Sequence, residues 1–168
     1  MRRFSVILVA FAALTAPTAV LAASLGADDG SLVVRHGQAP AGTPVVALTV
    51  TGSVIGNVDH GRIVIDAGPN TDASKAPVVT PNANCVRKEG ETVQRCTGDN
   101  FSFRAAGGKY VVFVYGSNVN LVAVGTGTAK VAGMPDTPSG DGRYSLNGND
   151  FVSLPGVQTD KLLIGSNN

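Results

Sequence analysis

Residues 45–66 read VVALTVTGSVIGNVDHGRIVID, and this stretch carries the pattern that decides the fold. Within it, Val46, Leu48 and Val50 alternate with small or hydroxyl-bearing residues. An apolar residue at every second position is typical of a half-buried β-strand, because successive side chains on a strand point to opposite faces. The stretch therefore predicts strands rather than a helix.

The same alternation recurs further along the chain. Phe101 and Phe103 alternate with polar residues, and so do Tyr144 and Leu146. The run Val111–Tyr115 differs because it is apolar at every position. A strand of this kind is expected in the centre of a sheet, covered on both faces, or at an interface.

Glycine and proline limit the length of every regular element. The chain contains 21 glycines and 9 prolines. After the N-terminal segment, no stretch lacking both residues is longer than eight residues. A typical helix has eleven or twelve residues, and an interior glycine or proline costs about 1 or 3 kcal/mol, so any helix is expected to be a single turn. The sequence predicts an all-β fold: an antiparallel sandwich or barrel of many short strands.

Turn residues lie between the apolar runs. Asp59-His60-Gly61 separates Val54–Val58 from Arg62–Asp66, and Gly61 is suited to the positive φ of a three-residue hairpin loop. Asn147-Gly148 predicts a further turn after the strand at Tyr144. These positions predict hairpins between neighbouring strands.

A weak internal repeat raises the question of two lobes. Gly52-Ser53, Ile55, Val58 and Gly61 recur at the same offsets as a second set, which comprises Gly116-Ser117, Val119, Val122 and Gly125. Either the chain carries a duplication, or strand and turn patterns in a chain rich in glycine and valine produce the match by chance.

The expected organisation is one exported domain, residues 23–168, with two related lobes as an alternative. The lobes would comprise residues 28–67 and 84–165, joined by the proline- and asparagine-rich segment 68–83. All aromatic residues of the exported part lie in the second lobe. The first lobe would have a thin core by itself, so we expect the lobes to share one core.

The N-terminus has the three parts of a signal peptide. Arg2 and Arg3 precede an apolar run from Phe4 to Leu14, and small or modest residues lead to Ala22. We expect residues 1–22 to be a signal peptide, cleaved between Ala22 and Ala23. The alternative is a membrane anchor, but the apolar run is too short to span a bilayer. The expected location is therefore secreted, extracellular or in the cell envelope, with no membrane span after cleavage.

Net charge narrows the classes of ligand that the exported part could bind. Removal of Arg2 and Arg3 from the 13 basic residues leaves the exported part, with its 12 acidic residues, at a net charge of −1. The basic residues do not cluster, which argues against nucleic-acid binding.

In an oxidising compartment Cys85 and Cys96 are expected to form a disulfide across the base of a hairpin or loop, contributing about 2–3 kcal/mol.

The search for catalytic residues yields few candidates. Only His36 and His60 offer an imidazole base, and no G-x-S-x-G motif is present. Asp59 beside His60 resembles an orienting acid and base, but neighbours on a strand point to opposite faces. We expect His60 to be an exposed turn residue and His36 to lie at a strand end.

The loops at residues 136–150 are the candidate for cation binding. They offer carboxylate, amide and carbonyl oxygens, which suit Ca²⁺. The same residue types favour turns by themselves, so the alternative is a set of turn residues. No zinc motif, phosphate loop or cofactor site is recognised in the sequence. The oxygen-bearing side chains of these loops are Asp136, Asp141, Asn147, Asn149 and Asp150.

Three stretches carry a resemblance to known proteins: Asp28–Val34, Val54–Ile65 and Gly140–Gly148. Together they look similar to a group of uncharacterised exported bacterial β-domain proteins. The resemblance implies the β fold class and an exported protein, and it implies no activity.

We therefore expect a non-enzymatic exported β-domain that binds or scaffolds a cell-envelope component or a protein partner. The strand Val111–Tyr115 could pair with that partner, and Tyr110 and Tyr115 could form a binding patch. Two alternatives remain open: a cell-wall-directed hydrolase that uses His60 or His36, and an exported protein that binds a cation or a small ligand.

Overall fold

The computed structural model describes residues 28–69, 71–135 and 142–165. The predicted signal peptide, residues 1–22, and the cleavage position Ala22–Ala23 lie outside the described residues. Strands dominate the described part, and its helical content is a single 3-10 turn, η1 (Ala73–Lys75). The prediction of an antiparallel all-β fold is confirmed. The strands are β1 (Gly30–Gly37), β2 (Val46–Asp66), β3 (Val78–Thr80), β4 (Ala83–Val86), β5 (Val93–Ser117), β6 (Val119–Val131), β7 (Arg143–Leu146), β8 (Val152–Ser153) and β9 (Leu162–Ile164).

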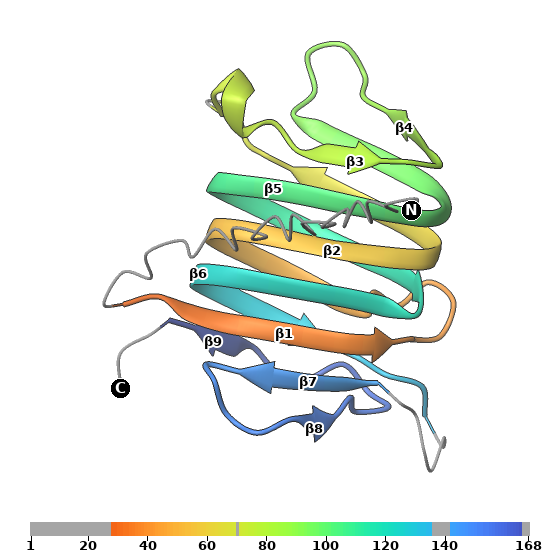
Figure 1. Cartoon of the computed structure of the whole chain (residues 1–168), viewed down its shortest axis with the longest axis vertical. Helices are drawn as coiled ribbons and strands as arrows, with labels where there is room; N and C mark the ends of the chain where they lie inside the picture. The colour runs from red at the N-terminus through yellow and green to blue at the C-terminus, as the bar shows by residue number, and fades with distance from the viewer. Residues whose placement is uncertain (1–27, 70, 136–141, 166–168) are drawn as a thin grey trace, which may run out of the picture.

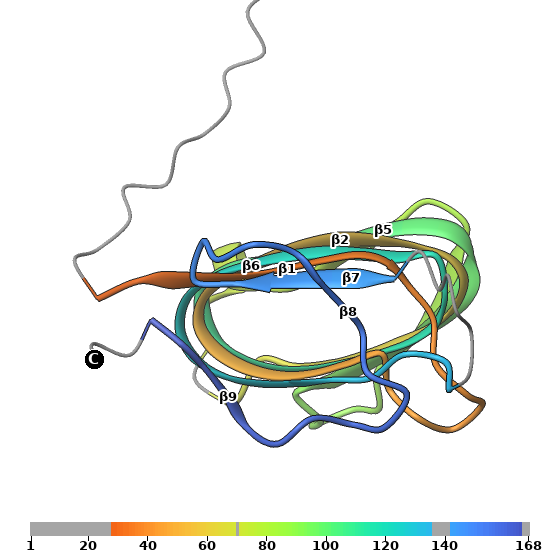
Figure 2. The ribbon, with the colours of Figure 1, turned by 90° about the horizontal axis from the view of Figure 1, so that it is seen from below.

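Three long strands wrap around the molecule and so form two layers. Viewed along the stack, β2, β5 and β6 outline a flattened ring (Figure 2). Viewed from the side, the strands lie one above another as a stack of bands (Figure 1). Each long strand crosses from one layer to the other at a corner, so one continuous sheet folds over on itself to enclose a core.

The pairing registers define the two layers. In layer A, the order is β9, the end of β6, the start of β2, the end of β5, the end of β2, the start of β5, and β4. In layer B, the order is β3, the middle of β5, the middle of β2, the start of β6, β1, β7 and β8. Val114 illustrates the arrangement, since it pairs with Val46 on one side and with Ile63 on the other.

The core lies between the layers and forms one hydrophobic cluster. Layer B contributes Phe101 and Phe103, which are 0% and 2% exposed, and layer A contributes Ile63, Val112 and Val114. Residues from both expected lobes, 28–67 and 84–165, belong to this cluster. β2 is paired with β5 and β6 along its length, which ties the two stretches together.

The corners lie along two edges of the flattened ring. At the glycine edge, Gly30, Gly125, Gly52 and Gly108 are successive cross-strand neighbours. Gly52 and Gly125 have φ values of +150° and +137°. A Cβ on Gly52 would lie 2.0 Å from the Val124 carbonyl oxygen. Only glycine fits this close approach of two backbones.

The opposite edge, here called the polar edge, turns with polar side chains. Four residues there have positive φ without being glycine: His36, Asn82, Asn100 and Asn118, at +51°, +59°, +51° and +49°. Asparagine tolerates this left-handed conformation better than most residues. Glycine is needed at this edge too, since a Cβ on Gly61 or Gly116 would lie 2.0 Å from a backbone carbonyl oxygen. The polar edge therefore combines close glycine contacts with corner residues that keep polar side chains.

The expected hairpin at Asp59-His60-Gly61 is wrong. Val54–Val58 and Arg62–Asp66 do not pair with each other; both belong to β2, which passes through a corner at the polar edge. Gly61 is needed for a different reason from the one expected: a Cβ there would lie 2.0 Å from the Tyr115 carbonyl oxygen. The turn at Asn147-Gly148 is confirmed, with φ values of +52° and +79°.

The short apolar runs are segments of longer strands. β2 has 21 residues and β5 has 25, because a strand continues through each corner instead of ending there. The internal repeat follows from this geometry. Gly52 to Gly61 and Gly116 to Gly125 each span one crossing of layer B, between the glycine edge and the polar edge.

Two further expectations need correction. Segment 68–83 is not an unpaired linker throughout, since it contains η1 and β3, and β3 pairs with β5. The run Val111–Tyr115 is central, as expected, but β2 pairs with it on both sides. No edge of this run is free for a partner strand.

Candidate ligand-binding groove

Both histidines of the chain lie at the polar edge. His36 is the next-to-last residue of β1, and His60 lies at the corner of β2 on this edge. Both are exposed; the sequence predicted exposure for His60 and a position at a strand end for His36. Asp59 does not orient His60: the two side chains have different partners, as expected for neighbours on an extended chain.

The partner of His60 is Asp99, at the corner of β5. The His60 Nδ1 lies 2.6 Å from Asp99 Oδ1, and the two side chains are 71% and 69% exposed. The two residues are direct cross-strand neighbours. The hydrogen bond to Asp99, followed by its negative charge, raises the pKa of His60 above the usual 6.5. Because both groups are exposed, this pair contributes little to stability.

His36 belongs to a second polar cluster on the same edge. Its Nδ1 lies 2.8 Å from Asn118 Oδ1, and Asn118 Nδ2 donates to Asp59 Oδ2 at 2.7 Å. The backbone N–H of His36 donates to Asn120 Oδ1 at 3.0 Å. These bonds join the corners of β1, β6 and β2. They account for His36, Asn118 and Asp59 as structural residues.

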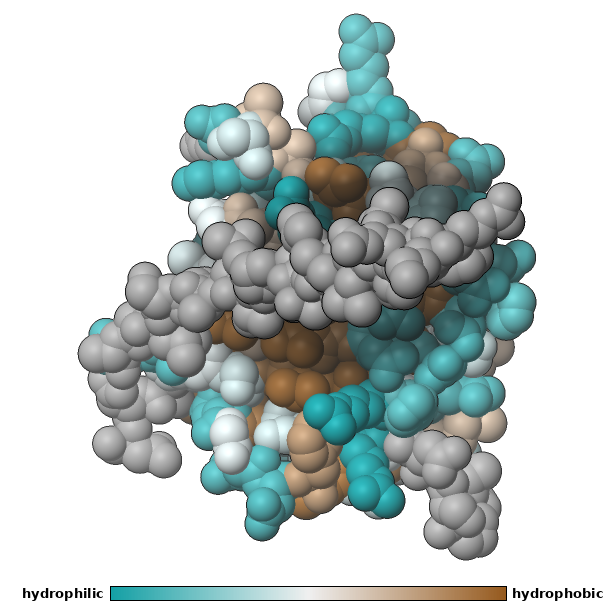
Figure 3. All heavy atoms as spheres, in the orientation of Figure 1, coloured by the Kyte–Doolittle hydropathy of each residue, from teal (hydrophilic) through white to brown (hydrophobic). Residues whose placement is uncertain are grey.

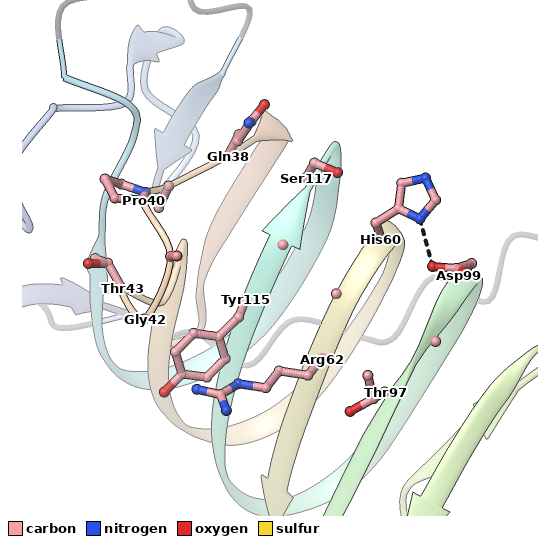
Figure 4. A pocket seen from close by; sticks show the side chains of 15 residues that line it. Gln38, Pro40, Gly42, Thr43, His60, Arg62, Thr97, Asp99, Tyr115 and Ser117 are labelled. Atoms are coloured by element: carbon pink, nitrogen blue, oxygen red, sulfur yellow. Dashed lines mark hydrogen bonds and ion pairs between the residues drawn. The ribbon is translucent and has the colours of Figure 1, made fainter.

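A shallow groove of about 780 Å³ begins at the His60–Asp99 pair and continues over the outer face of layer A. Ligand sites in proteins commonly have volumes of this size. The floor consists of the paired strands at Arg62, Tyr115 and Thr97, and the loop at residues 38–43 forms the opposite wall (Figure 4).

An arginine and a tyrosine meet inside the groove. The Arg62 Cζ lies 4.1 Å from the centre of the Tyr115 ring, so the guanidinium is stacked on the ring. Arg62 has no carboxylate within ion-pair distance in the described part of the chain. Arg95 differs, because its guanidinium lies 2.7 Å from Glu91. Among the described residues, no carboxylate therefore neutralises the positive charge of Arg62.

The arrangement of side chains in the groove gives little support to catalysis by a serine nucleophile. Ser117, His60 and Asp99 are cross-strand neighbours in one row. In the described part of the chain, however, no hydrogen bond joins the Ser117 hydroxyl to the imidazole. Figure 4 shows the imidazole turned toward Asp99 and away from Ser117. The row has the residue types of a hydrolase without the contact that would activate the serine.

The outer face of layer B is different in character. Val33, Val122 and Ile55 are cross-strand neighbours on it, and Ile55 is 55% exposed. Hydrophobic residues gather over β6 and β1 on this face (Figure 3). A second arginine also stacks here, with the Arg35 Cζ 4.6 Å from the Phe151 ring centre.

The disulfide prediction is confirmed. Cys85 and Cys96 are bonded at 2.05 Å and are direct cross-strand partners in β4 and β5. The bridge closes the base of a hairpin, as expected. It also fixes β4 at the end of layer A, where Cys96 lies three residues before the Asp99 corner of β5.

The predicted binding patch of Tyr110 and Tyr115 is wrong for Tyr110. Tyr110 is fully buried, and its hydroxyl donates to the carbonyls of Lys75 and Ala106, at 2.8 and 2.9 Å. Burial raises the pKa of Tyr110 above its usual value. Tyr115 lies in the groove and remains a candidate binding residue.

The structure describes only part of the candidate cation loops at residues 136–150. Asp136 and Asp141 lie outside the described residues. Asn147 is a structural residue: its Oδ1 accepts from the backbone N–H groups of Ser31 and Gly165, and its Nδ2 donates to Leu163. Among the described residues, no group of three His, Cys, Asp or Glu side chains could hold a metal ion.

The sequence analysis missed the groove residues Arg62, Thr97 and Asp99, although it had proposed Tyr115 as a binding residue. A signal was present in the chain. Gly98-Asp99-Asn100-Phe101 and Gly116-Ser117-Asn118-Val119 follow the same order of glycine, polar residue, asparagine and apolar residue, 18 positions apart. This spacing corresponds to one circuit of β5 around the molecule, so it places Asp99 and Ser117 at the same edge.

Comparisons with known proteins add no further information on this site. No protein-family model, no curated protein and no solved structure matches the chain. In the described part of the chain, no helix is long and apolar enough to cross a membrane.

Proposed function

We propose that this chain is an exported, non-enzymatic β-domain that binds a component of the cell envelope or extracellular medium through the groove on layer A. The observation that carries the proposal is the unpaired Arg62 guanidinium stacked on Tyr115, beside the His60–Asp99 pair. Rigid strands position these side chains, which lowers the entropy lost when a ligand binds.

Export is part of the proposal. The predicted signal peptide at residues 1–22 supports it, and the Cys85–Cys96 disulfide is compatible with an oxidising compartment. The expected result is that the mature chain, isolated from the medium or envelope fraction, begins at Ala23 when its N-terminus is sequenced. Full-length protein that begins at Met1 and stays in the cytoplasmic fraction would contradict export.

The binding role is tested by capture. Biotinylated protein comprising residues 23–168 is incubated with envelope and culture-fluid fractions from the cells that produce it. The wild type is expected to retain a component that the Arg62→Ala, Tyr115→Ala double variant loses. Arg35→Ala serves as a matched control, because Arg35 also stacks on an exposed aromatic ring but lies outside the groove.

Two results would contradict the binding role. One is that the wild type retains nothing from either fraction. The other is that the double variant retains the same component as the wild type. Circular dichroism of each variant shows whether the β fold is intact, so a loss of capture is not mistaken for unfolding.

A hydrolase is the second candidate, because Asp99, His60 and Ser117 lie in one cross-strand row. Closure around a substrate would have to bring the Ser117 hydroxyl to the imidazole. The prediction is hydrolysis of cell-wall material that His60→Ala and Ser117→Ala each abolish. Wild-type protein that is inactive on a broad panel of ester, amide and glycoside substrates would exclude this candidate.

A further inference from the structure

We propose that the ligand of the groove is an acidic glycan, with Arg62 binding a sugar carboxylate. This inference rests on the binding role proposed above and names the chemical class of the ligand. Three features of the groove lead to it: an unneutralised guanidinium, a set of groups suited to hydroxyls, and a floor of fully paired strands.

Arg62 supplies the charge. Its guanidinium carries five N–H donors in a planar fork, which matches the two oxygens of a carboxylate. Stacking on Tyr115 at 4.1 Å holds the plane of the fork, so less side-chain entropy is lost on binding. The nearest acidic side chain of the groove, Asp99, is already paired with His60 at 2.6 Å.

The remaining groups of the groove suit hydroxyls better than further charges. Asp99 uses Oδ1 for His60 and, being 69% exposed, leaves Oδ2 free to accept from a ligand hydroxyl. Gln38, Thr43, Thr97 and Ser117 add neutral donors and acceptors along the walls. One cation among many neutral polar groups matches a sugar that carries one carboxylate and several hydroxyls.

The same features disfavour an acidic peptide. A peptide that binds as an added strand needs an open sheet edge. The floor of the groove has none, because Arg62 in β2 pairs with Thr97 on one side and with Tyr115 on the other. A glycan binds through its hydroxyls and carboxylates and needs no such edge.

The test uses a short oligogalacturonate and its methyl ester, titrated into residues 23–168 by isothermal titration calorimetry. The two probes have the same sugar rings and hydroxyls, and only the first has free carboxylates. The free acid is expected to bind at least about tenfold more tightly, since a hydrogen bond to a charged group is worth about 1.5–3 kcal/mol. Polyglutamate is titrated in parallel as an acidic peptide.

The variants assign the preference to Arg62. Arg62→Ala is expected to bind both forms of the glycan equally weakly, and Arg62→Lys to recover only part of the preference, because a lysine lacks the planar fork. Arg35→Ala should bind like the wild type, because Arg35 lies outside the groove. Each variant is checked for an unchanged circular dichroism spectrum.

Several results would overturn the proposal: equal affinity for the acid and the ester, a preference that survives Arg62→Ala, or no binding of the acid at all. Binding of polyglutamate with the same dependence on Arg62 would replace the glycan with an acidic peptide. If capture of an envelope component depends on Arg62 while oligogalacturonate does not bind, the binding role stands and the acidic-glycan class is wrong.

Discussion

The two edges of the flattened sheet solve one geometric problem with different residues. At both edges a long strand must leave one layer and enter the other while its neighbours do the same. The glycine edge does this with Gly52 and Gly125, whose Cα atoms lie too close to neighbouring backbone to accept a side chain. The polar edge uses glycine in the same way at Gly61 and Gly116, and it adds corner residues that keep their side chains: Asn100, Asn118, Asp59 and His60.

The difference affects what each edge can present to a ligand. A corner made from glycine offers backbone alone, and its substitution by any larger residue disturbs the pairing of two strands. A corner made from asparagine, aspartate and histidine tolerates its own left-handed backbone and presents polar groups to solvent. In this fold, the candidate groove begins where polar side chains, His60 and Asp99 among them, stand beside the close contacts of Gly61 and Gly116.

The largest effect is expected at the glycine edge. Gly125→Ala places a Cβ 2.1 Å from the Thr51 carbonyl oxygen at a φ of +137°. Urea denaturation should show a loss of about 2–4 kcal/mol in the free energy of unfolding, from overpacking and backbone strain together. Gly148→Ala is the control, because its φ is +79° and nothing lies within 4 Å of the added Cβ; it should lose about 1–2 kcal/mol.

If the two alanine variants were equally stable, close backbone contact would not be the reason for glycine at this edge. The comparison between the edges would then have no steric basis.

An intermediate effect is expected at the polar edge. Asn118→Ala removes the hydrogen bonds to His36 and Asp59 and places alanine at a φ of +49°. The expected loss is about 1–2 kcal/mol in urea denaturation. Asn118→Gly should lose less, because glycine adopts this φ freely and only the hydrogen bonds are missing. A glycine variant less stable than the alanine variant would show that the left-handed backbone is not the cost at this corner.

A change in protonation without a large change in stability is expected at His60. Asp99→Asn removes the charge that raises the pKa of His60, so the pKa measured by NMR should fall toward 6.5. In the wild type, the favourable contact is fully present below the ordinary histidine pKa and fades as the pH rises through the raised value. A His60 pKa that is the same in both proteins would mean that the pair does not form in solution.

The smallest effect is expected at Ser53, a residue of the glycine edge. The Ser53 hydroxyl accepts from the Gly107 N–H at 3.3 Å in an exposed position. Ser53→Ala should change the free energy of unfolding by no more than about 0.5 kcal/mol and leave capture of the ligand unchanged. Loss of capture in this variant would show that the functional surface extends to the glycine edge.

Much of the secondary structure could be predicted from residue order. Val46, Leu48 and Val50 are buried on one face of β2, as their alternation indicated. The position of the disulfide followed from two cysteines at the ends of a short charged stretch. The groove could not be predicted in this way, because Arg62 and Tyr115 are more than fifty positions apart and nothing in either neighbourhood marks them as partners.

The error at Asp59-His60-Gly61 has a physical cause. A hairpin and a corner use the same turn-forming residues, and local sequence does not tell whether the following strand pairs with the preceding one. That choice depends on which strands are available on either side, here β5 on both sides of the end of β2.

The sequence by itself determined that this chain forms strands, since glycine and proline leave no room for helices and alternation hides valine, isoleucine and phenylalanine on one face. It also determined where the backbone can turn. The tertiary structure alone decided that the strands run on through their corners, and that β2 and β5 coil around each other. That coiling brings Asp99, His60 and Ser117 into one row and Arg62 onto Tyr115, because cross-strand register is a property of the paired strands and not of either one alone.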